Sequence, residues 1–137
     1  MVAIIHIVSL DGTLLFYFSS TESKCCPSLL VRTTGVSNSS QYIRFGGYTR
    51  IDTYFDRPVY VHEAREEFLF YMAGRSRGLW MIGPEVGQFS GGLANRADDQ
   101  CPQTIGKSWK YADGTGWSVD PDIQIQCLNN KPGRKTT

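Results

Sequence analysis

The sequence predicts an all-β domain, a small antiparallel sandwich or barrel of short strands that is stapled by disulfide bonds. Three observations support this fold class: short β-prone segments with turn residues between them, 14 glycines and 6 prolines in 137 residues, and an even set of 4 cysteines. Glycine and proline interrupt regular structure, and closely spaced short strands are typical of all-β domains. A chain of this length has room for one compact domain.

The composition narrows the classes of function. Lysine and arginine total 14 and aspartate and glutamate 13, so the formal net charge is +1. We therefore expect no nucleic-acid partner, because nucleic-acid modules usually carry a clear basic excess. Hydrophobic residues make up 41% of the chain, which is enough for a packed core. No apolar run approaches the roughly 20 residues of a membrane-spanning helix, so no membrane span is expected.

The chain divides into residues 1–24, a cysteine-framed module at 25–127, and a polar tail at 128–137 that is typical of a linker or a disordered end. Residues 1–24 hold two apolar runs on either side of Asp11-Gly12. Three interpretations stay open for them: a secretory leader, a β-hairpin that turns at Asp-Gly, or the misassigned start of a longer secreted protein.

Within the module, the strict alternation of residues 123–127 indicates a strand with one apolar side. Residues 63–74 begin with acidic residues and end with glycine, as helices do, but their apolar residues form one continuous block. We therefore prefer a hairpin, with strands at 59–62 and 68–72 around a charged turn, and a single helical turn in the charged part is the alternative. The other expected strands cover residues 28–33, 41–45, 48–55, 57–61 and 78–83, with a loop at 37–40.

The cysteines are expected to form two disulfides. Neighbouring residues of a strand point in different directions, so Cys25 and Cys26 should bond to different partners, one to Cys127 and the other to Cys101. Closing so long a loop stabilises the fold by about 4 kcal/mol in the chain-entropy model. The alternatives are reduced thiols in a cytosolic protein and a zinc site, although the C-x₂₋₄-C pairs usual for zinc are absent.

One glycosylation motif accompanies the cysteines. Asn38-Ser39-Ser40 is an N-x-S/T sequon in the loop expected after the first strand of the module. A sequon is a weak signal alone. Together with paired cysteines it favours an extracellular location.

No catalytic constellation is evident, so we expect no enzyme activity, no cofactor and no metal. His62 stands beside Glu63 in the expected hairpin and is interpreted as a surface turn residue rather than a general base. The glycine-rich segments are best explained as turns, because no helix-forming run follows them. Calcium binding is the alternative for one set of carboxylates, although their spacing matches no calcium loop. That set is Asp98, Asp99, Asp113, Asp120 and Asp122.

Aromatic and basic residues supply the candidates for ligand contact. Trp117 lies between Gly116 and Ser118 in a turn region and is the best candidate for an exposed ring, whereas Trp80 is expected in the core. Arg75 and Arg77 stand between two glycines at an expected loop tip. Solvated loop charge is the default interpretation for both arginines, and contact with an anionic glycan or an acidic partner is the functional one.

The order of motifs resembles a cysteine-framed extracellular β module of about a hundred residues found in multidomain proteins of invertebrates. The resemblance covers most of residues 25–127 and none of the first 24. It implies a secreted or cell-surface module without catalysis, and it carries no binding residues over to this chain. The motifs are Gly47-Tyr48, Arg57-Pro58-Val59-Tyr60, Phe68-Leu69-Phe70-Tyr71, Trp80-Met81-Ile82-Gly83, Gly91-Gly92-Leu93-Ala94, Pro102, Trp109, Trp117-Ser118-Val119-Asp120 and Ile123-Gln124-Ile125-Gln126-Cys127.

These observations favour an extracellular interaction or adhesion module with a protein or glycan ligand at the cell surface or in the matrix. The rival hypothesis is an intracellular structural domain with reduced cysteines, whose protein partner contacts the apolar N-terminal segment. A small hydrolase that uses His62 is a more distant third.

Overall fold

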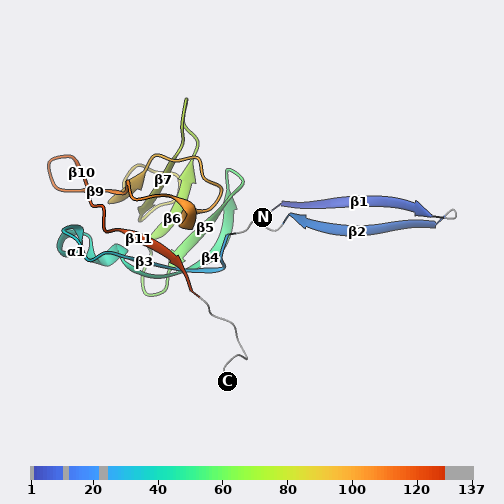
Figure 1. The fold of residues 1–137 in the computed structure, drawn as a ribbon, viewed down its shortest axis with the longest axis horizontal. Helices are drawn as coiled ribbons and strands as arrows, with labels where there is room; N and C mark the ends of the chain where they lie inside the picture. Colours follow the sequence, from blue (N-terminus) through green and yellow to red (C-terminus); the bar gives the residue numbers. More distant parts are fainter. Residues whose placement is uncertain (1, 11–12, 22–24, 129–137) are drawn as a thin grey trace, which may run out of the picture.

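The computed structural model describes the backbone of residues 2–10, 13–21 and 25–128, and side chains from residue 25 onward. It contains two separate antiparallel sheets (Figure 1). The first is a two-stranded sheet of β1 (Val2–Leu10) and β2 (Thr13–Thr21), in register from Val2 opposite Thr21 to Leu10 opposite Thr13. Residues 2–10 and 13–21 thus pair as antiparallel strands, as the hairpin interpretation expects. The expected turn residues, Asp11 and Gly12, lie outside the described residues.

The module itself is a nine-stranded sheet in the order β10-β9-β8-β7-β6-β5-β4-β3-β11. All its neighbouring strands pair antiparallel, and the sheet curls into a half-barrel, which confirms the predicted fold class. Its strands are β3 (Ser28–Arg32), β4 (Gly46–Tyr54), β5 (Arg57–His62), β6 (Phe68–Met72), β7 (Leu79–Gly83), β8 (Leu93–Asn95), β9 (Lys110–Ala112), β10 (Trp117–Val119) and β11 (Gln124–Cys127).

Apolar side chains cover both faces of the sheet. On β6, Leu69 and Tyr71 belong to one buried cluster, while Phe70 and Met72 belong to another. Successive side chains of a strand point to opposite faces, so the two clusters lie on opposite sides of the sheet. The larger cluster contains Leu29, Val31, Tyr48, Tyr60, Leu69, Tyr71, Trp80, Ile82, Leu93, Trp109 and Ile123. The smaller cluster contains Val59, Phe70, Met72, Leu79, Met81 and Ala94.

This two-sided burial explains the continuous apolar block at residues 68–72. Phe68 is partly exposed and the other residues of β6 are buried, as expected for a strand in the middle of a sheet. β6 pairs with β5 across residues 63–67, so the predicted hairpin is confirmed. Trp80 on β7 is fully buried, which confirms its prediction as a core residue.

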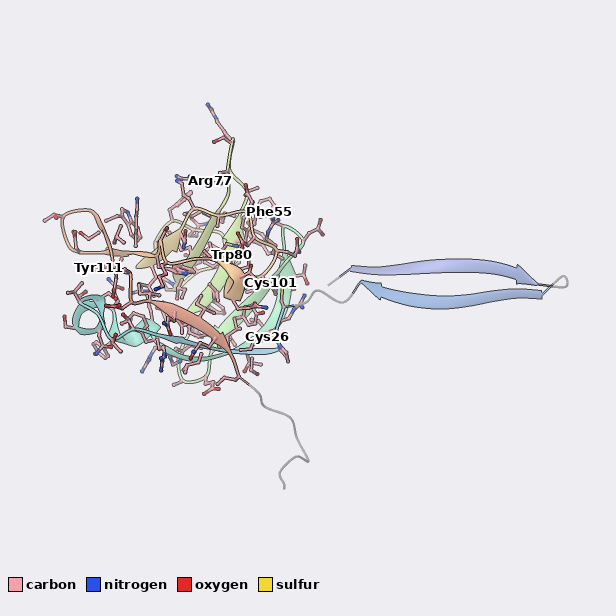
Figure 2. The ribbon with its side chains drawn as sticks, viewed as in Figure 1. Cys26, Phe55, Arg77, Trp80, Cys101 and Tyr111 are labelled. Atoms are coloured by element: carbon pink, nitrogen blue, oxygen red, sulfur yellow. A yellow bond between two sulfur atoms is a disulfide. The ribbon has the colours of Figure 1, made fainter. Side chains whose placement is uncertain are left out.

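Two disulfides fasten the ends of the module (Figure 2). Cys25 pairs with Cys101 and Cys26 with Cys127, at Cα–Cα distances of 5.1 and 5.7 Å. The adjacent cysteines therefore bond to different partners, as predicted, and the structure settles which partner each one takes. The Cys26–Cys127 bond joins the start of the module to β11.

Two local predictions between β3 and β4 are wrong. Residues 37–40, expected as a loop, form the single turn α1 (Ser37–Ser40), and the expected strand at 41–45 contains the 3₁₀ helix η1 (Tyr42–Arg44). The cause is tertiary: buried Asp120 accepts hydrogen bonds from the backbone N–H and the hydroxyl of Ser37. At residues 41–45, Gln41 Nε2 donates a hydrogen bond to the carbonyl oxygen of Ala112 and Arg44 pairs with Glu67, so contacts with distant segments outweigh the local β propensity.

The interpretation of His62 as a surface residue is also wrong. His62 ends β5 and is buried, and its ring packs edge-on against Tyr48 at a centroid distance of 5.0 Å. Its Nε2 lies 2.9 Å from the carbonyl oxygen of Phe45, and its Nδ1 accepts a hydrogen bond from the N–H of Ala64. Both ring nitrogens are held by backbone groups, so the residue has a structural role.

Candidate functional site

A pocket of about 410 Å³ lies over β7, β8, β9 and β10. This volume is in the range of small-ligand sites. Trp117 is 45% exposed and Phe89 71% exposed, so both aromatic rings are accessible to a ligand at its walls. The pocket is lined by Leu79, Met81, Phe89, Ala94 and Trp117 and by the polar residues Arg77, Asn95, Arg96, Ser108 and Lys110.

The register of the sheet brings these residues together. Met81 lies opposite Ala94, and Ala94 lies opposite Lys110. Directly opposed residues of antiparallel strands project to the same face, which here is the face of the smaller apolar cluster. Val119 lies opposite Lys110, and Trp117 is two residues before Val119, so strand alternation places Trp117 on this face as well.

The pocket has a cationic end and an aromatic end. Asn95, the last residue of β8, lies opposite Trp80. The next residue, Arg96, is therefore level with Leu79, where β7 begins. Arg77 precedes Leu79 by two residues, in the loop that projects between β6 and β7 (Figures 1 and 2). Trp117 begins β10 after the turn from β9, at the other end of these strands.

A hydrogen-bonded turn fixes Trp117. Asp113 Oδ1 accepts hydrogen bonds from Thr115 N–H at 2.9 Å and Gly116 N–H at 2.8 Å, and the Ser118 hydroxyl bonds to the other carboxylate oxygen. Hydrogen bonds from Ser118 and Thr115 hold the pKa of Asp113 well below its usual range. The carboxylate therefore stays charged at neutral pH and ties together the residues on both sides of Trp117.

The loop that carries Arg77 is anchored in a similar way. Asp98 Oδ1 accepts a hydrogen bond from the Tyr71 hydroxyl at 2.6 Å and another from the N–H of Gly78 at 2.7 Å. These two bonds, from Tyr71 first, lower the pKa of Asp98. Arg57 stacks over the Tyr71 ring at 3.8 Å from its centroid and donates hydrogen bonds to the backbone oxygens of Asp98 and Asp99. The base of the Arg77 loop is thus fixed against the sheet.

The pocket is electropositive. Arg77, Arg96 and Lys110 line it, and none of its lining residues is acidic. Among the described residues, no ion pair within 4.0 Å joins Arg77, Arg96 or Lys110 to a carboxylate, although the hydrogen bond from Tyr71 and, to a lesser extent, the nearby charge of Arg77 lower the pKa of Asp98. The cationic end is available to an anionic group of a ligand.

The structure places the predicted ligand-contact residues in two groups. Trp117 and Arg77 both line the pocket, whereas Arg75 is exposed in the same loop without lining it. Asn38 of the sequon is exposed on α1 and also lies outside the lining.

Three of the five carboxylates considered for calcium serve as hydrogen-bond acceptors in separate places: Asp98 below the Arg77 loop, Asp113 in the β9–β10 turn, and Asp120 under α1. Over residues 25–128, no group of three or more histidine, cysteine, aspartate or glutamate side chains is placed to hold a metal ion. None of the helices in the described part of the chain is long and apolar enough to cross a membrane.

Sequence reasoning missed the other walls of the pocket. Lys110 and Arg96 are isolated cations in short polar segments, and Phe89 stands in a loop. The polar residues Ser108 and Lys110 flank the apolar Trp109, and this alternation is the one pattern in the sequence that indicates an accessible face in this segment.

Fold and site define a small, disulfide-bonded β domain with a cationic and aromatic pocket, and the disulfides indicate an oxidising environment. Comparison of the chain with protein-family models, with curated proteins and with solved structures found no match. The resemblance to extracellular modules of invertebrate proteins is therefore still a prediction.

Proposed function

We propose that this protein is an extracellular, non-catalytic binding module that recognises a glycan in the pocket at Trp117. The observation that carries the proposal is the position of Trp117: it is the one tryptophan with an exposed ring, since Trp80 and Trp109 are 0% and 1% exposed. Its ring lies at a concave site with cations instead of on a flat surface. An accessible aromatic face beside polar side chains suits the apolar face and the hydroxyl groups of a sugar ring.

The scaffold supports this function. Two disulfides and nine paired strands hold the pocket walls, and hydrogen bonds accepted by Asp113 and Asp98 fix the turn and the loop that carry its two ends. A site prepared in this way loses little conformational entropy on binding. The exposed sequon at Asn38 and the disulfides favour the secretory route over a reducing cytosol.

The test is a glycan array probed with the full chain secreted from a eukaryotic host. Trp117→Ala removes the aromatic wall, and Val119→Ala is the matched control, because Val119 is 52% exposed on the same strand and does not line the pocket. We expect the wild type and Val119→Ala to bind the same glycans, and Trp117→Ala to lose at least about tenfold in affinity. Absence of glycan binding, or full binding by Trp117→Ala, would overturn the proposal.

A further inference from the structure

We infer that the glycan is acidic: its sugar ring lies on Trp117, and a sulfate or carboxylate group lies against the cations at the other end of the pocket. This inference rests on the proposed function and adds the chemical class of the ligand. In the sequence, an anionic ligand is only the second interpretation of Arg75 and Arg77, and the net charge of +1 gives it no further support. The fold creates an anion site by gathering three cations into a single concavity.

The arrangement of the cations carries the first step. Lys110 lies opposite Ala94 at the middle of the pocket, and Arg96 lies two residues beyond Ala94 along the same strand direction. Residues two apart on an extended strand share a face and are about 7 Å apart. Arg77 reaches the same end from the neighbouring loop. Arg77 and Arg96 therefore lie at one end of the pocket, with Lys110 beside them toward its middle.

The lining of the pocket contains no carboxylate, which is the second observation in favour of an acidic ligand. Surface cations are usually interspersed with acidic residues, which neutralise them. Here the lining has three cations and no acidic residue, and the described carboxylates nearest in sequence to the pocket walls, Asp98 and Asp113, are occupied by hydrogen bonds from Tyr71, Gly78, Thr115 and Gly116. The lining itself is therefore cationic: Asp98 lies outside it and is near enough to Arg77 for the two charges to interact, whereas Arg96 and Lys110 face no lining carboxylate.

The shape of the site favours a sugar over an acidic protein. An open concavity of about 410 Å³ suits a compact unit of one or a few rings. Stable protein partners cover surfaces of about 800 Å² on each side, far more than one such concavity. Arginine forms paired hydrogen bonds to the planar edge of a carboxylate or to two oxygens of a sulfate, so Arg77 and Arg96 suit both acid groups.

The test compares three polysaccharides with one backbone: dextran, carboxymethyl-dextran and dextran sulfate, as short chains of equal length. Binding to the secreted full chain is measured by calorimetry at two ionic strengths. We expect at least one of the two acidic polysaccharides to bind at least about tenfold more tightly than dextran, with an affinity that falls as salt rises. The two acidic forms distinguish a sulfate site from a carboxylate site.

Matched variants show whether the pocket is responsible. Arg77→Gln and Lys110→Gln each remove one lining cation, and we expect each to weaken acidic binding by about tenfold. Arg75→Gln makes the same charge change two residues from Arg77 but outside the pocket, so its affinity should stay within about twofold of the wild type. Equal losses in all three variants would indicate a diffuse charge effect and overturn the inference.

Other outcomes separate this inference from the proposed function. If a neutral glycan binds with the same dependence on Trp117 and without help from Lys110 or Arg77, the glycan function stands and the acidic class is wrong. If no glycan binds in either experiment, the proposed function itself fails. If poly-glutamate of similar charge binds the pocket more tightly than both acidic dextrans, the ligand is an acidic polypeptide and the inference is contradicted.

Discussion

Arg44 and Glu67 form a buried ion pair across the space between η1 and the turn before β6. Arg44 Nε lies 2.9 Å from Glu67 Oε1, and the two side chains are only 14% and 6% exposed. The Arg44 guanidinium also donates a hydrogen bond of 2.7 Å to Gln41 Oε1, while Gln41 Nε2 donates one to the carbonyl oxygen of Ala112 at the end of β9. A polar chain thus connects the β5–β6 turn to the strand beside the candidate pocket.

The first prediction is that Arg44→Met lowers the free energy of unfolding by about 3 kcal/mol at pH 7, because it leaves the Glu67 carboxylate buried without its cation. Arg44→Met combined with Glu67→Leu should recover most of this loss, since no buried charge then remains. Urea denaturation of the two variants and the wild type measures both effects. An unchanged stability in Arg44→Met would show that the pair does not stabilise the fold.

The same pair gives a pH dependence. Burial raises the pKa of Glu67, although Arg44, His62 and Arg65 oppose the shift. For a carboxyl with a raised folded-state pKa, the contribution to stability is complete below the unfolded pKa of about 4.3 and declines as the pH rises through the folded value. The cost of Arg44→Met should therefore shrink at pH 4, where a neutral Glu67 no longer needs a cation.

The second prediction concerns Asp120, which is fully buried. Burial raises its pKa, but hydrogen bonds from Ser37, Asp122 and Thr33 outweigh burial and hold the pKa below its usual value. Its stabilising effect is therefore complete above pH 4 and is lost as the pH falls through the folded-state pKa. Asp120→Asn should lower the free energy of unfolding by about 2 kcal/mol at pH 7, and by less as the pH falls and the wild-type carboxylate becomes protonated.

Urea denaturation at a series of pH values from 7 to 2 follows this difference. Asp122→Asn is the control, because Asp122 is an exposed neighbour in the same segment and its effect should stay small throughout. A gap between the wild type and Asp120→Asn that stays constant over the whole series would contradict the role assigned to the buried carboxylate.

The third prediction concerns the disulfides, which enclose sequence separations of 76 and 101 residues. We expect the double variant Cys25→Ala/Cys101→Ala to lower the free energy of unfolding by about 4 kcal/mol in the chain-entropy model. The double variant Cys26→Ala/Cys127→Ala should lower it by about the same amount. Alkylation and intact-mass measurement of the secreted wild type should find no free thiol. Four free thiols in a folded sample would instead favour the intracellular hypothesis.

The fourth prediction uses the tight turn between β4 and β5. Phe55 and Asp56 have φ angles of 52° and 59°, in the left-handed region that favours glycine and asparagine. Asn-Gly is the preferred pair for such a turn, so Phe55→Asn with Asp56→Gly should raise the free energy of unfolding by about 1 kcal/mol. Phe55→Ala is the control and should give no gain, since alanine at a positive φ is still strained and the edge contact with Tyr54 is lost. Thermal unfolding distinguishes the outcomes.

Strands with a clear burial pattern could be predicted from the sequence. The continuous apolar block of β6 and the glycine-bracketed β7 reflect strands buried in the middle of the sheet, and the alternation along β11 reflects an edge strand with half-buried Ile125 between exposed Gln124 and Gln126. Strands β8, β9 and β10 were not predicted, because three residues are too few to establish a period. They become strands by pairing with neighbours that are already in the sheet.

The candidate site was predictable only in part, for a related reason. Trp117 and Arg77 stood out because a glycine-rich turn and a loop tip are recognisable from sequence. Nothing local links these two residues, which are 40 positions apart, or links either of them to Lys110. Their meeting depends on the registers of β7 with β8, β8 with β9 and β9 with β10, and those registers belong to the folded sheet alone.

The measurement that tests the central claim most directly is an NMR titration that follows the three tryptophan indole N–H signals while dextran sulfate or carboxymethyl-dextran chains are added. We predict a saturable shift of the Trp117 signal, with small changes for buried Trp109 and for Trp80, whose indole N–H donates to the carbonyl oxygen of Asp99 at 3.1 Å. A Trp117 signal that stays in place while calorimetry shows binding would contradict the account, because the ligand would then occupy another surface.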